Sequence, residues 1–158
     1  MPELPEVETV RRGLAPAMED ARFVHVVAHR GDLRWPLPKD FAARLKGRSV
    51  VGLGRRAKYL LADLSSGDVL LMHLGMSGSF RVTRNGDART PGAFHYQRSD
   101  FGTHDHVVFG MSSGATIAFN DPRRFGCMKL FPRRNIDDEP LLRALGPEPL
   151  GNEFDVAM

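Results

Sequence analysis

Short apolar stretches separated by turn-forming residues limit this chain to a mainly β fold. The stretches are Phe23–His29, Val50–Leu64, Val69–Leu74, His106–Met111 and Thr116–Asn120. Turns rich in serine and glycine, at residues 65–68 and 112–114, separate several of them. Consecutive strands joined by tight turns are typical of antiparallel sheets. We therefore predict a two-layer antiparallel β-sandwich or flattened barrel with flanking helices.

The first residues depart from this pattern and predict an N-terminal helix over Pro2–Leu14. Pro5 suits its first turn, acidic residues near its start and basic residues near its end complement the helix dipole, and Gly13 is the expected stop. The helical spacing creates one apolar face, made by Val7, Val10 and Leu14. A second short helix is expected within residues 38–47.

The length of 158 residues is enough for one domain with its own core. Residues 84–103 are polar and rich in glycine and arginine, so we expect a long loop there. From Pro132 the sequence becomes acidic and contains prolines, which is typical of an exit from one domain towards another. We therefore place the main domain at residues 1–131 and an interdomain segment at residues 132–158.

Neither a membrane location nor export is indicated by the sequence. No apolar run approaches the roughly 18 residues that cross a bilayer, and the N-terminus lacks the basic and then apolar pattern of a signal peptide. Cys127 is the only cysteine, which excludes an intrachain disulfide and a multi-cysteine zinc site within these residues. We expect a cytoplasmic protein.

Positive charge is concentrated in the main part of the chain. Residues 1–131 carry 19 basic and 13 acidic side chains, whereas residues 132–158 carry 3 basic and 6 acidic ones. A basic body attracts a polyanion, and nucleic acid is the commonest candidate. The solvated surface of a mildly basic protein would have the same composition, so charge alone does not decide between the two.

The N-terminal residues offer covalent chemistry if Met1 is removed, which a small second residue such as proline permits. Pro2 then presents a secondary α-amine, and α-amines titrate near 8, so a fraction is neutral and nucleophilic at cellular pH. Attack on a sugar C1′ would form an iminium that promotes elimination of phosphate, and Glu3 could transfer the protons. A retained Met1 would block this chemistry, and the same residues could simply begin a helix.

Six motifs then follow in order. They are MPELPEVETVRRGL at 1–14, GRRAKYLL at 54–61, MHLGMSGS at 72–79, THDHV at 103–107, NDPRRFG at 120–126 and LGPEPL at 145–150. Together they closely resemble the formamidopyrimidine-DNA glycosylases, bacterial enzymes that repair 8-oxoguanine. The PELPEVET opening favours this family over the related endonuclease VIII. The resemblance implies a two-layer antiparallel β catalytic domain, in agreement with the strand pattern.

The resemblance also implies catalytic roles for four residues. Pro2 would be the nucleophile that forms a Schiff base with the damaged nucleotide, and Glu3 would be the catalytic acid. Lys58, inside the strand-like GRRAKYLL block, would donate a proton during β-elimination and contact phosphate. Glu6 would support the active site. From the residues alone, Lys58 is also consistent with a solvated lysine on a basic strand. The neighbouring Arg55 and Arg56 are likewise consistent with solvated strand residues.

Four further residues are implied in DNA binding. Met76, Arg123 and Phe125 match the family's void-filling triad, since an enzyme that turns a nucleotide out of the stack must occupy the gap. For Met76 and Phe125, core packing is the alternative. His104 matches a DNA-contacting position. His104 and His106 would share a strand face and so form a conceivable metal pair, but no third ligand has convincing spacing.

In the family, the segment after LGPEPL leads to a helix–two-turn–helix domain and a four-cysteine zinc finger, which lie outside this sequence. We therefore expect no cofactor in this chain. The resemblance implies a monomeric, nucleoid-associated bacterial enzyme whose partner is double-stranded DNA with oxidised purines or abasic sites. Two hypotheses remain: a bifunctional glycosylase and abasic-site lyase, or a truncated non-catalytic DNA-binding domain that binds DNA weakly and with strong salt dependence.

Overall fold

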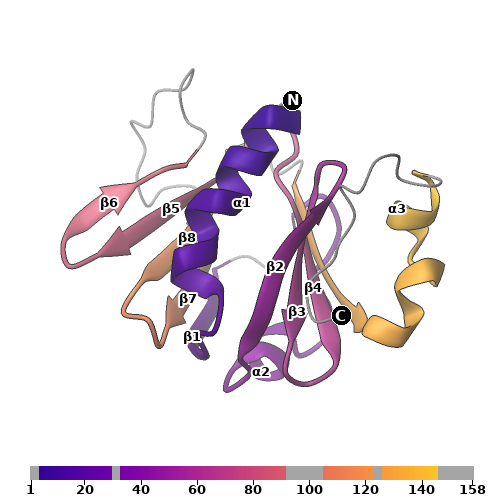
Figure 1. Ribbon diagram of the computed structural model, residues 1–158, viewed down its shortest axis with the longest axis horizontal. Coiled ribbons are helices and arrows are strands. Elements are labelled where there is room, and N and C mark those ends of the chain that lie inside the picture. The colour runs from indigo at the N-terminus through magenta and orange to yellow at the C-terminus, as the bar shows by residue number, and fades with distance from the viewer. Residues whose placement is uncertain (1–3, 30–32, 92–104, 123–125, 146–158) are drawn as a thin grey trace.

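The computed structural model describes residues 4–29, 33–91, 105–122 and 126–145, which form two antiparallel sheets packed face to face (Figure 1). Within these residues, one sheet has the strand order β1-β7-β8-β5-β6 and the other β2-β3-β4-β9. The first sheet consists of β1 (Phe23–Ala28), β5 (Ser79–Arg84), β6 (Asp87–Arg89), β7 (Asp105–Met111) and β8 (Thr116–Asn120). The second consists of β2 (Val50–Arg56), β3 (Tyr59–Leu64), β4 (Asp68–His73) and β9 (Cys127–Pro132). The predicted two-layer antiparallel β structure is confirmed, and the two sheets do not close into a barrel.

The core between the sheets follows the alternation of side chains along each strand. On β3, Leu60 and Ala62 point into this core, together with Leu70 on the neighbouring strand β4. Phe23 and Phe109 pack edge to face, with their ring centroids 5.1 Å apart. The strand-like stretches therefore form strands because alternate residues have a shared apolar layer to fill.

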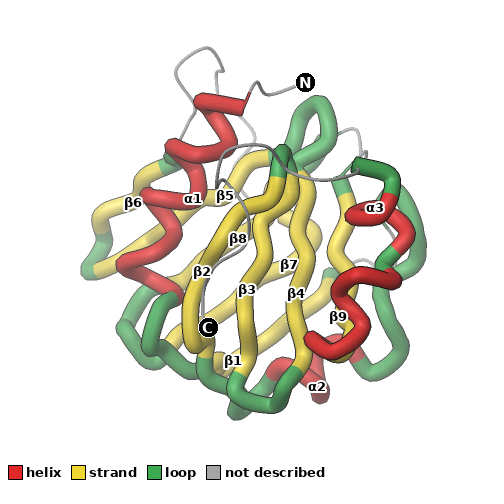
Figure 2. Tube along the Cα trace, turned by 45° about the vertical axis from the view of Figure 1, so that its right-hand side comes forward, coloured by secondary structure: helices red, strands yellow, loops and turns green. Residues whose placement is uncertain are grey.

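A second apolar cluster covers the outer face of the β2-β3-β4-β9 sheet. The residues of the cluster are Leu61, Val69, Leu71, Cys127 and Leu142. The chain after β9 supplies the cover, because a 3₁₀ helix, η1 (Arg133–Asp138), and helix α3 (Pro140–Arg143) fold back onto this face (Figure 2). An ion pair of 2.5 Å between Lys129 and Glu139 supports that packing. The predicted division at residue 131 stays a prediction, but residues 133–143 pack on the same body as the strands.

Helix α1 (Leu4–Met18) runs beside β2 and along the open side of the two sheets (Figure 1). Its predicted apolar face is confirmed, since Val7, Val10 and Leu14 are buried. The predicted stop at Gly13 is wrong, because the helix continues through it. A Cβ at Gly13 would overlap the ring of Pro91, so the glycine permits close packing. Helix α2 (Phe41–Leu45) lies within the expected 38–47 range.

Two predicted segments differ in the structure. Val50–Leu64 was expected as one strand-like stretch, but it forms the hairpin of β2 and β3, which turns at Ala57 and Lys58. The long loop expected over 84–103 begins instead with the end of β5 and the short strand β6. The side chains of β6 are all exposed, so no apolar pattern marked it as a strand. Among the described residues, no helix is both long and apolar enough to cross a membrane.

Candidate functional site

The structure describes three of the eight residues predicted for the site. Glu6 lies in the first turns of α1, Lys58 in the β2–β3 turn and Met76 in the loop between β4 and β5. The remaining five lie outside the described residues, namely Pro2, Glu3, His104, Arg123 and Phe125.

Lys58 lies in a tight turn rather than inside a strand. Arg56 pairs with Tyr59 across the hairpin, and Ala57 and Lys58 close it. Ala57 has φ 51°, in the left-handed region that usually favours glycine, asparagine or aspartate. A half-buried lysine at a hairpin tip can reach past both strands, whereas a lysine within a strand points only to one face of its sheet.

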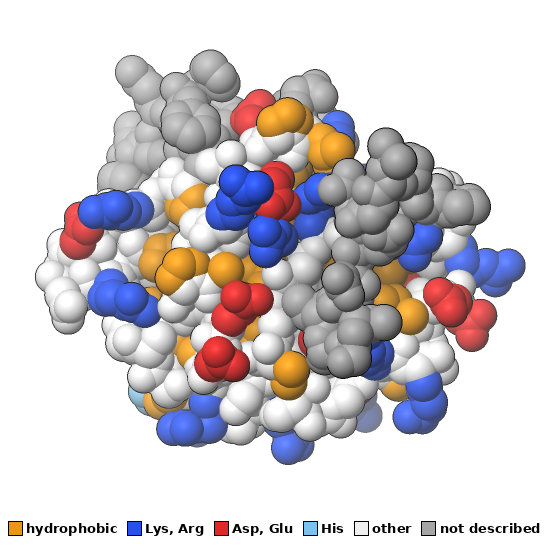
Figure 3. Space-filling model, viewed as in Figure 1, with side chains coloured by type: hydrophobic (Ala, Val, Ile, Leu, Met, Phe, Trp, Pro, Cys, Tyr) orange, Lys and Arg blue, Asp and Glu red, His pale blue; other side chains and the backbone are white. Residues whose placement is uncertain are grey.

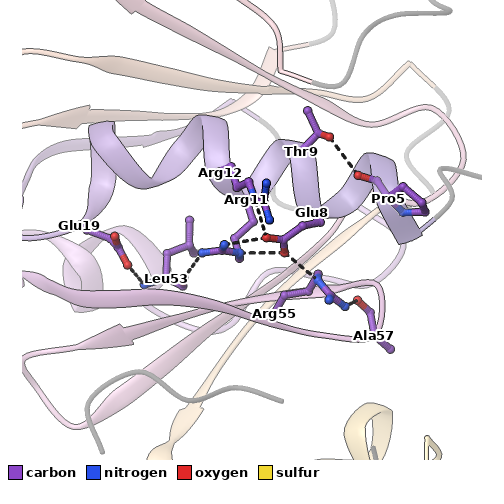
Figure 4. A network of polar contacts seen from close by, with 9 residues as sticks. All are labelled: Pro5, Glu8, Thr9, Arg11, Arg12, Glu19, Leu53, Arg55 and Ala57. Carbon is purple, nitrogen blue, oxygen red and sulfur yellow. Dashed lines mark hydrogen bonds and ion pairs between the residues drawn. The ribbon is translucent and has the colours of Figure 1, made fainter. Parts of the chain in front are cut away.

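Glu8 in α1 is the centre of a network of arginines (Figure 4). Its carboxylate accepts hydrogen bonds from Arg11 at 2.9 and 2.7 Å and from Arg12 at 2.9 Å, both on the same helix. It also accepts one from Arg55 Nε on β2, at 3.0 Å. The hydrogen bonds, that of Arg11 foremost, lower the pKa of Glu8 from 4.5 to about 2. Glu8 therefore stays ionised at any physiological pH.

Arg55 links this network to the turn that carries Lys58. Besides its ion pair with Glu8, its Nη1 donates to the backbone carbonyl of Ala57 at 2.9 Å. Its side chain is 9% exposed. The interpretation of Arg55 as a solvated strand residue is wrong, since it is buried and bound at both ends of its guanidinium. On the face drawn in Figure 3, blue and red side chains lie next to one another over α1, so this face is not of one sign.

Met76 lies on a tight exposed loop whose shape depends on Gly78. The amide of Gly78 donates to the carbonyl of Leu74 at 2.9 Å, and a Cβ on Gly78 would overlap that carbonyl. Met76 is 43% exposed at the tip. Core packing, the alternative for this side chain, is therefore wrong for Met76. Phe125, for which the same alternative was open, lies outside the described residues.

The carboxylate of Asp121 joins the Met76 loop to the segment that follows β8. Asp121 is fully buried. One carboxylate oxygen accepts from the Ser77 hydroxyl at 2.7 Å, and the other accepts from the Gly126 amide at 2.8 Å. Ser77 follows Met76 directly, and Gly126 follows Phe125 directly. A single buried side chain thus binds two residues that each directly follow a predicted DNA-contacting residue in the sequence.

His106 supports Asp121 from the next strand. Its Nε2 lies 2.6 Å from the backbone carbonyl of Asp121, and a carbonyl can only accept, so Nε2 carries the proton and donates. That nitrogen therefore has no lone pair for a metal in this arrangement. His104, the other member of the conceivable metal pair, lies outside the described residues. The geometry gives His106 the role of holding β7 to the end of β8.

His73 lies between the Lys58 turn and the Met76 loop. Its Nδ1 accepts from the amide of Gly75 at 3.2 Å, and its ring packs on Tyr59 with centroids 4.8 Å apart. Burial, and after it the positive charges of Arg34 and Lys58, lower the pKa of His73. It is therefore a hydrogen-bonded structural histidine.

Arg34 is the functional candidate that sequence reasoning missed. Its backbone amide donates to the carbonyl of Gly126 at 2.9 Å, which places it beside the Asp121-linked loops. Its charge acts on His73 together with that of Lys58. Arg34 is far from both in sequence and lies in no strand or helix, so no periodic pattern could have revealed it. Arg34 and Lys58 each lower the pKa of this half-buried imidazole and Asp121 raises it, so both cations act on the same ring. Cationic side chains attract an anion such as a phosphate.

Comparison with known proteins places these elements in a family. Residues 1–128 match the model of the formamidopyrimidine-DNA glycosylase N-terminal domain. The chain is 72% identical over 158 residues to the formamidopyrimidine-DNA glycosylase of Rhodopseudomonas palustris (strain TIE-1), covering 100% of this chain and 54% of that protein. It is 70% identical to the corresponding protein of Afipia carboxidovorans, again covering 54% of it. The chain thus spans about half the length of the curated relatives it matches.

Solved structures agree with the sequence comparison. The crystal structure of Lactococcus lactis formamidopyrimidine-DNA glycosylase bound non-covalently to DNA containing an abasic site matches 97% of this chain and 54% of that one, with a TM-score of 0.74 and 27% identity. The complex of the same enzyme with DNA containing a formamidopyrimidine form of deoxyguanosine matches with the same TM-score and identity and covers 53% of that chain.

Proposed function

The chain belongs to the formamidopyrimidine-DNA glycosylase family, and from this membership we propose that it provides the catalytic half of a base excision repair enzyme. The enzyme would remove oxidised purines, namely 8-oxoguanine and formamidopyrimidines, and cleave the strand at the resulting abasic site. The match over residues 1–128 is the observation that carries this proposal. The solved relatives bound to abasic-site and formamidopyrimidine DNA support the substrate class.

The proposed reaction begins at the N-terminal amine. After removal of Met1, the lone pair of the Pro2 nitrogen attacks C1′ of the damaged nucleotide, and the bond from C1′ to the base breaks with its electron pair going to the base. The proton released from the Pro2 nitrogen goes to the departing base. Glu3 supplies a proton to the sugar ring oxygen, and ring opening leaves an iminium between Pro2 and C1′. Loss of a proton from C2′ then expels the 3′ phosphate. Lys58 serves as proton donor in this elimination.

The surroundings of Lys58 suit a phosphate of the cleaved strand. Arg34 and Lys58 both lower the pKa of His73, whereas Asp121 raises it, so two cations act on that ring. Lysine and arginine are the usual partners of nucleic-acid phosphates, and their contacts position the backbone without reading sequence. We therefore assign phosphate binding to Lys58 and Arg34, with His73 packed between the elements that carry them.

The Met76 loop suits the filling of a gap in the duplex. Its exposed thioether side chain is flexible and apolar, as inserted side chains commonly are. Arg123 and Phe125, which their sequence motif assigns to the same task, lie outside the described residues, but Asp121 binds both Ser77, which follows Met76, and Gly126, which follows Phe125. We propose that these three side chains occupy the space left by the displaced nucleotide, with Arg123 bonding the unpaired base.

Borohydride trapping tests the proposal. The chain with Met1 removed is incubated with a duplex that contains an abasic site, and a covalent adduct that survives reduction is expected. Pro2→Gly keeps an α-amine but makes it primary, and should slow trapping, whereas a form that retains Met1 should give no adduct at this site. The same measurements on a chimera, in which the second half of the Rhodopseudomonas palustris relative follows residue 158, reveal how far the chain needs that half.

The second candidate function is a DNA-binding domain without catalysis of its own. It is the second hypothesis for residues 1–158 taken alone, which correspond to 54% of the Rhodopseudomonas palustris relative. Under this hypothesis the chain alone binds abasic-site duplex, weakly and with strong salt dependence, but yields no adduct, while the chimera does. An absence of adduct from both proteins would contradict the catalytic proposal. The monomeric state, the nucleoid location and the absence of a cofactor from this chain stay predictions.

A further inference from the structure

We propose that Arg55 is a positioning residue that ties the first turns of α1 to the turn carrying Lys58, so that the N-terminal nucleophile and Lys58 keep one relative geometry. The inference rests on the proposed function, because that function assigns catalytic roles to residues on both elements. Arg55 itself would touch neither the DNA nor the reacting atoms. It acts through two partners, Glu8 and Ala57.

The guanidinium of Arg55 binds both partners at once. Its Nε lies 3.0 Å from a carboxylate oxygen of Glu8, and its Nη1 lies 2.9 Å from the carbonyl oxygen of Ala57 (Figure 4). The donors of a guanidinium are fixed in one plane, so two bonds from the same group fix the direction between the partners. A lysine at this position could keep the charge but not both bonds.

The turn at Ala57 needs such a contact to keep its shape. A left-handed backbone is unfavourable for a non-glycine residue and persists only where the surroundings impose it. Ala57 has φ 51° and carries no side-chain group that could bond to the backbone. Its carbonyl is held by Arg55. We infer that this bond keeps the turn in the conformation from which Lys58 projects.

The other end of the link is equally fixed. Glu8 is held on its own helix by two hydrogen bonds from Arg11, one to each carboxylate oxygen, so its carboxylate is not free to follow Arg55. Arg11 also donates to the carbonyl of Leu53 on β2 at 3.2 Å, and this bond is a second connection between α1 and β2. Glu8 lies in the second turn of α1, which begins at Leu4, shortly after Pro2 in the sequence.

The coupling of Glu8 to the Lys58 turn through Arg55 can be tested without an activity assay. In the isotope-labelled full chain, Glu8→Gln is expected to shift the backbone amide resonances of Ala57 and Lys58, which Glu8 reaches through Arg55. The same substitution in an Arg55→Lys background should leave them nearly unchanged. Lysine keeps the positive charge, so an effect of equal size in both backgrounds would mean that Glu8 acts through space, and the proposal would be wrong. Unshifted turn resonances in Glu8→Gln would also overturn it.

The functional consequence is tested on strand cleavage at an abasic site under single-turnover conditions. Arg55→Lys should lower the rate by about tenfold or more, because small misplacements of catalytic groups are costly, while the Kd for the duplex stays within about twofold. Ala57→Gly in that background should recover most of the rate, since glycine adopts positive φ without support. Arg12→Lys, a matched change on the same carboxylate, should have no effect.

Each outcome has a separate meaning. A rate for Arg55→Lys equal to that of Arg12→Lys, or no recovery with Ala57→Gly, would contradict the positioning role even if the wild-type chain cleaves well. If the wild-type chain does not cleave at all, the proposed function fails for this chain. The resonance experiment then still decides whether Arg55 couples α1 to the Lys58 turn.

Discussion

Replacing Asp121 by alanine removes the carboxylate that joins the Met76 loop to the segment ending at Gly126. Asp121 is fully buried and accepts from the Ser77 hydroxyl at 2.7 Å and the Gly126 amide at 2.8 Å. Hydrogen bonds to a charged group contribute about 1.5–3 kcal/mol each, and a buried amide left without an acceptor costs about 1–3 kcal/mol. Because these contributions overlap, we expect Asp121→Ala to lower the free energy of unfolding by about 3–5 kcal/mol.

Asp121→Asn distinguishes the contribution of the two hydrogen bonds to stability from that of the negative charge. The asparagine oxygen can accept from Gly126, and its amide nitrogen can donate to the Ser77 hydroxyl, which is able to accept. Both bonds survive in neutral form, so the expected cost is only about 1–1.5 kcal/mol. Ser77→Ala removes one bond and leaves the other, and should fall between the two aspartate variants.

Urea unfolding followed by the fluorescence of Trp35, the single tryptophan of the chain, measures these differences. The slope of the free energy against urea should be the same for all four proteins if they unfold in two states. A cost below about 1 kcal/mol for Asp121→Ala would refute the reasoning, since the carboxylate would not then hold the loops. Equal costs for Asp121→Ala and Asp121→Asn would refute the assignment of the bonds.

Three further predictions concern the helices. Gly13→Ala should destabilise the fold by about 1–3 kcal/mol in urea unfolding, although the same change in an open helix stabilises, because the new methyl group meets Pro91; a gain in stability would contradict this packing. The folded pKa of Glu8, about 2, lies below the ordinary value of 4.5, so its contribution to stability is complete above pH 4.5 and is lost as the pH falls towards 2. The free energy of unfolding should therefore fall less steeply with decreasing pH over that range in Glu8→Gln than in the wild-type chain. Identical pH dependence in the two proteins would argue against the arginine network. Leu142→Ala should cost about 2–4 kcal/mol because its side chain is fully buried on the outer face of the β2-β3-β4-β9 sheet; a cost near zero would mean that α3 is not part of the cooperative unit.

The alternation of apolar residues was sufficient to predict the layers of this fold. Thr116–Asn120 has the predicted bounds, and Phe23–Ala28 differs from the prediction by one residue, because buried strands carry a period of two that sequence reveals. Val50–Leu64 was predicted as one stretch because Arg55 and Arg56 continue the strand pattern up to the turn. Ala57 is not a residue that marks a left-handed turn, so the hairpin could not be read from it.

Site residues could be predicted from the sequence only where they lie in a motif of the family. Lys58 and Met76 came from the family resemblance, and the structure adds that one lies on a hairpin tip and the other on an exposed loop. The partners of Arg55 were not predictable, since Glu8 is 47 residues away and its bond depends on how α1 packs against β2. The prediction of a helix end at Gly13 was wrong for a related reason. A glycine after a helical pattern usually indicates the end of the helix, whereas the close packing of Gly13 against Pro91 depends on the tertiary structure.

The most direct test of the central claim is to locate the covalent bond to DNA. After borohydride reduction with an abasic-site duplex, the trapped protein is digested and the modified peptide sequenced by mass spectrometry. The account predicts a remnant of the sugar on the nitrogen of Pro2, at the N-terminus of a chain that has lost Met1. A remnant on Lys58 or another lysine, with an unmodified N-terminus, would contradict the assignment of Pro2 as the nucleophile.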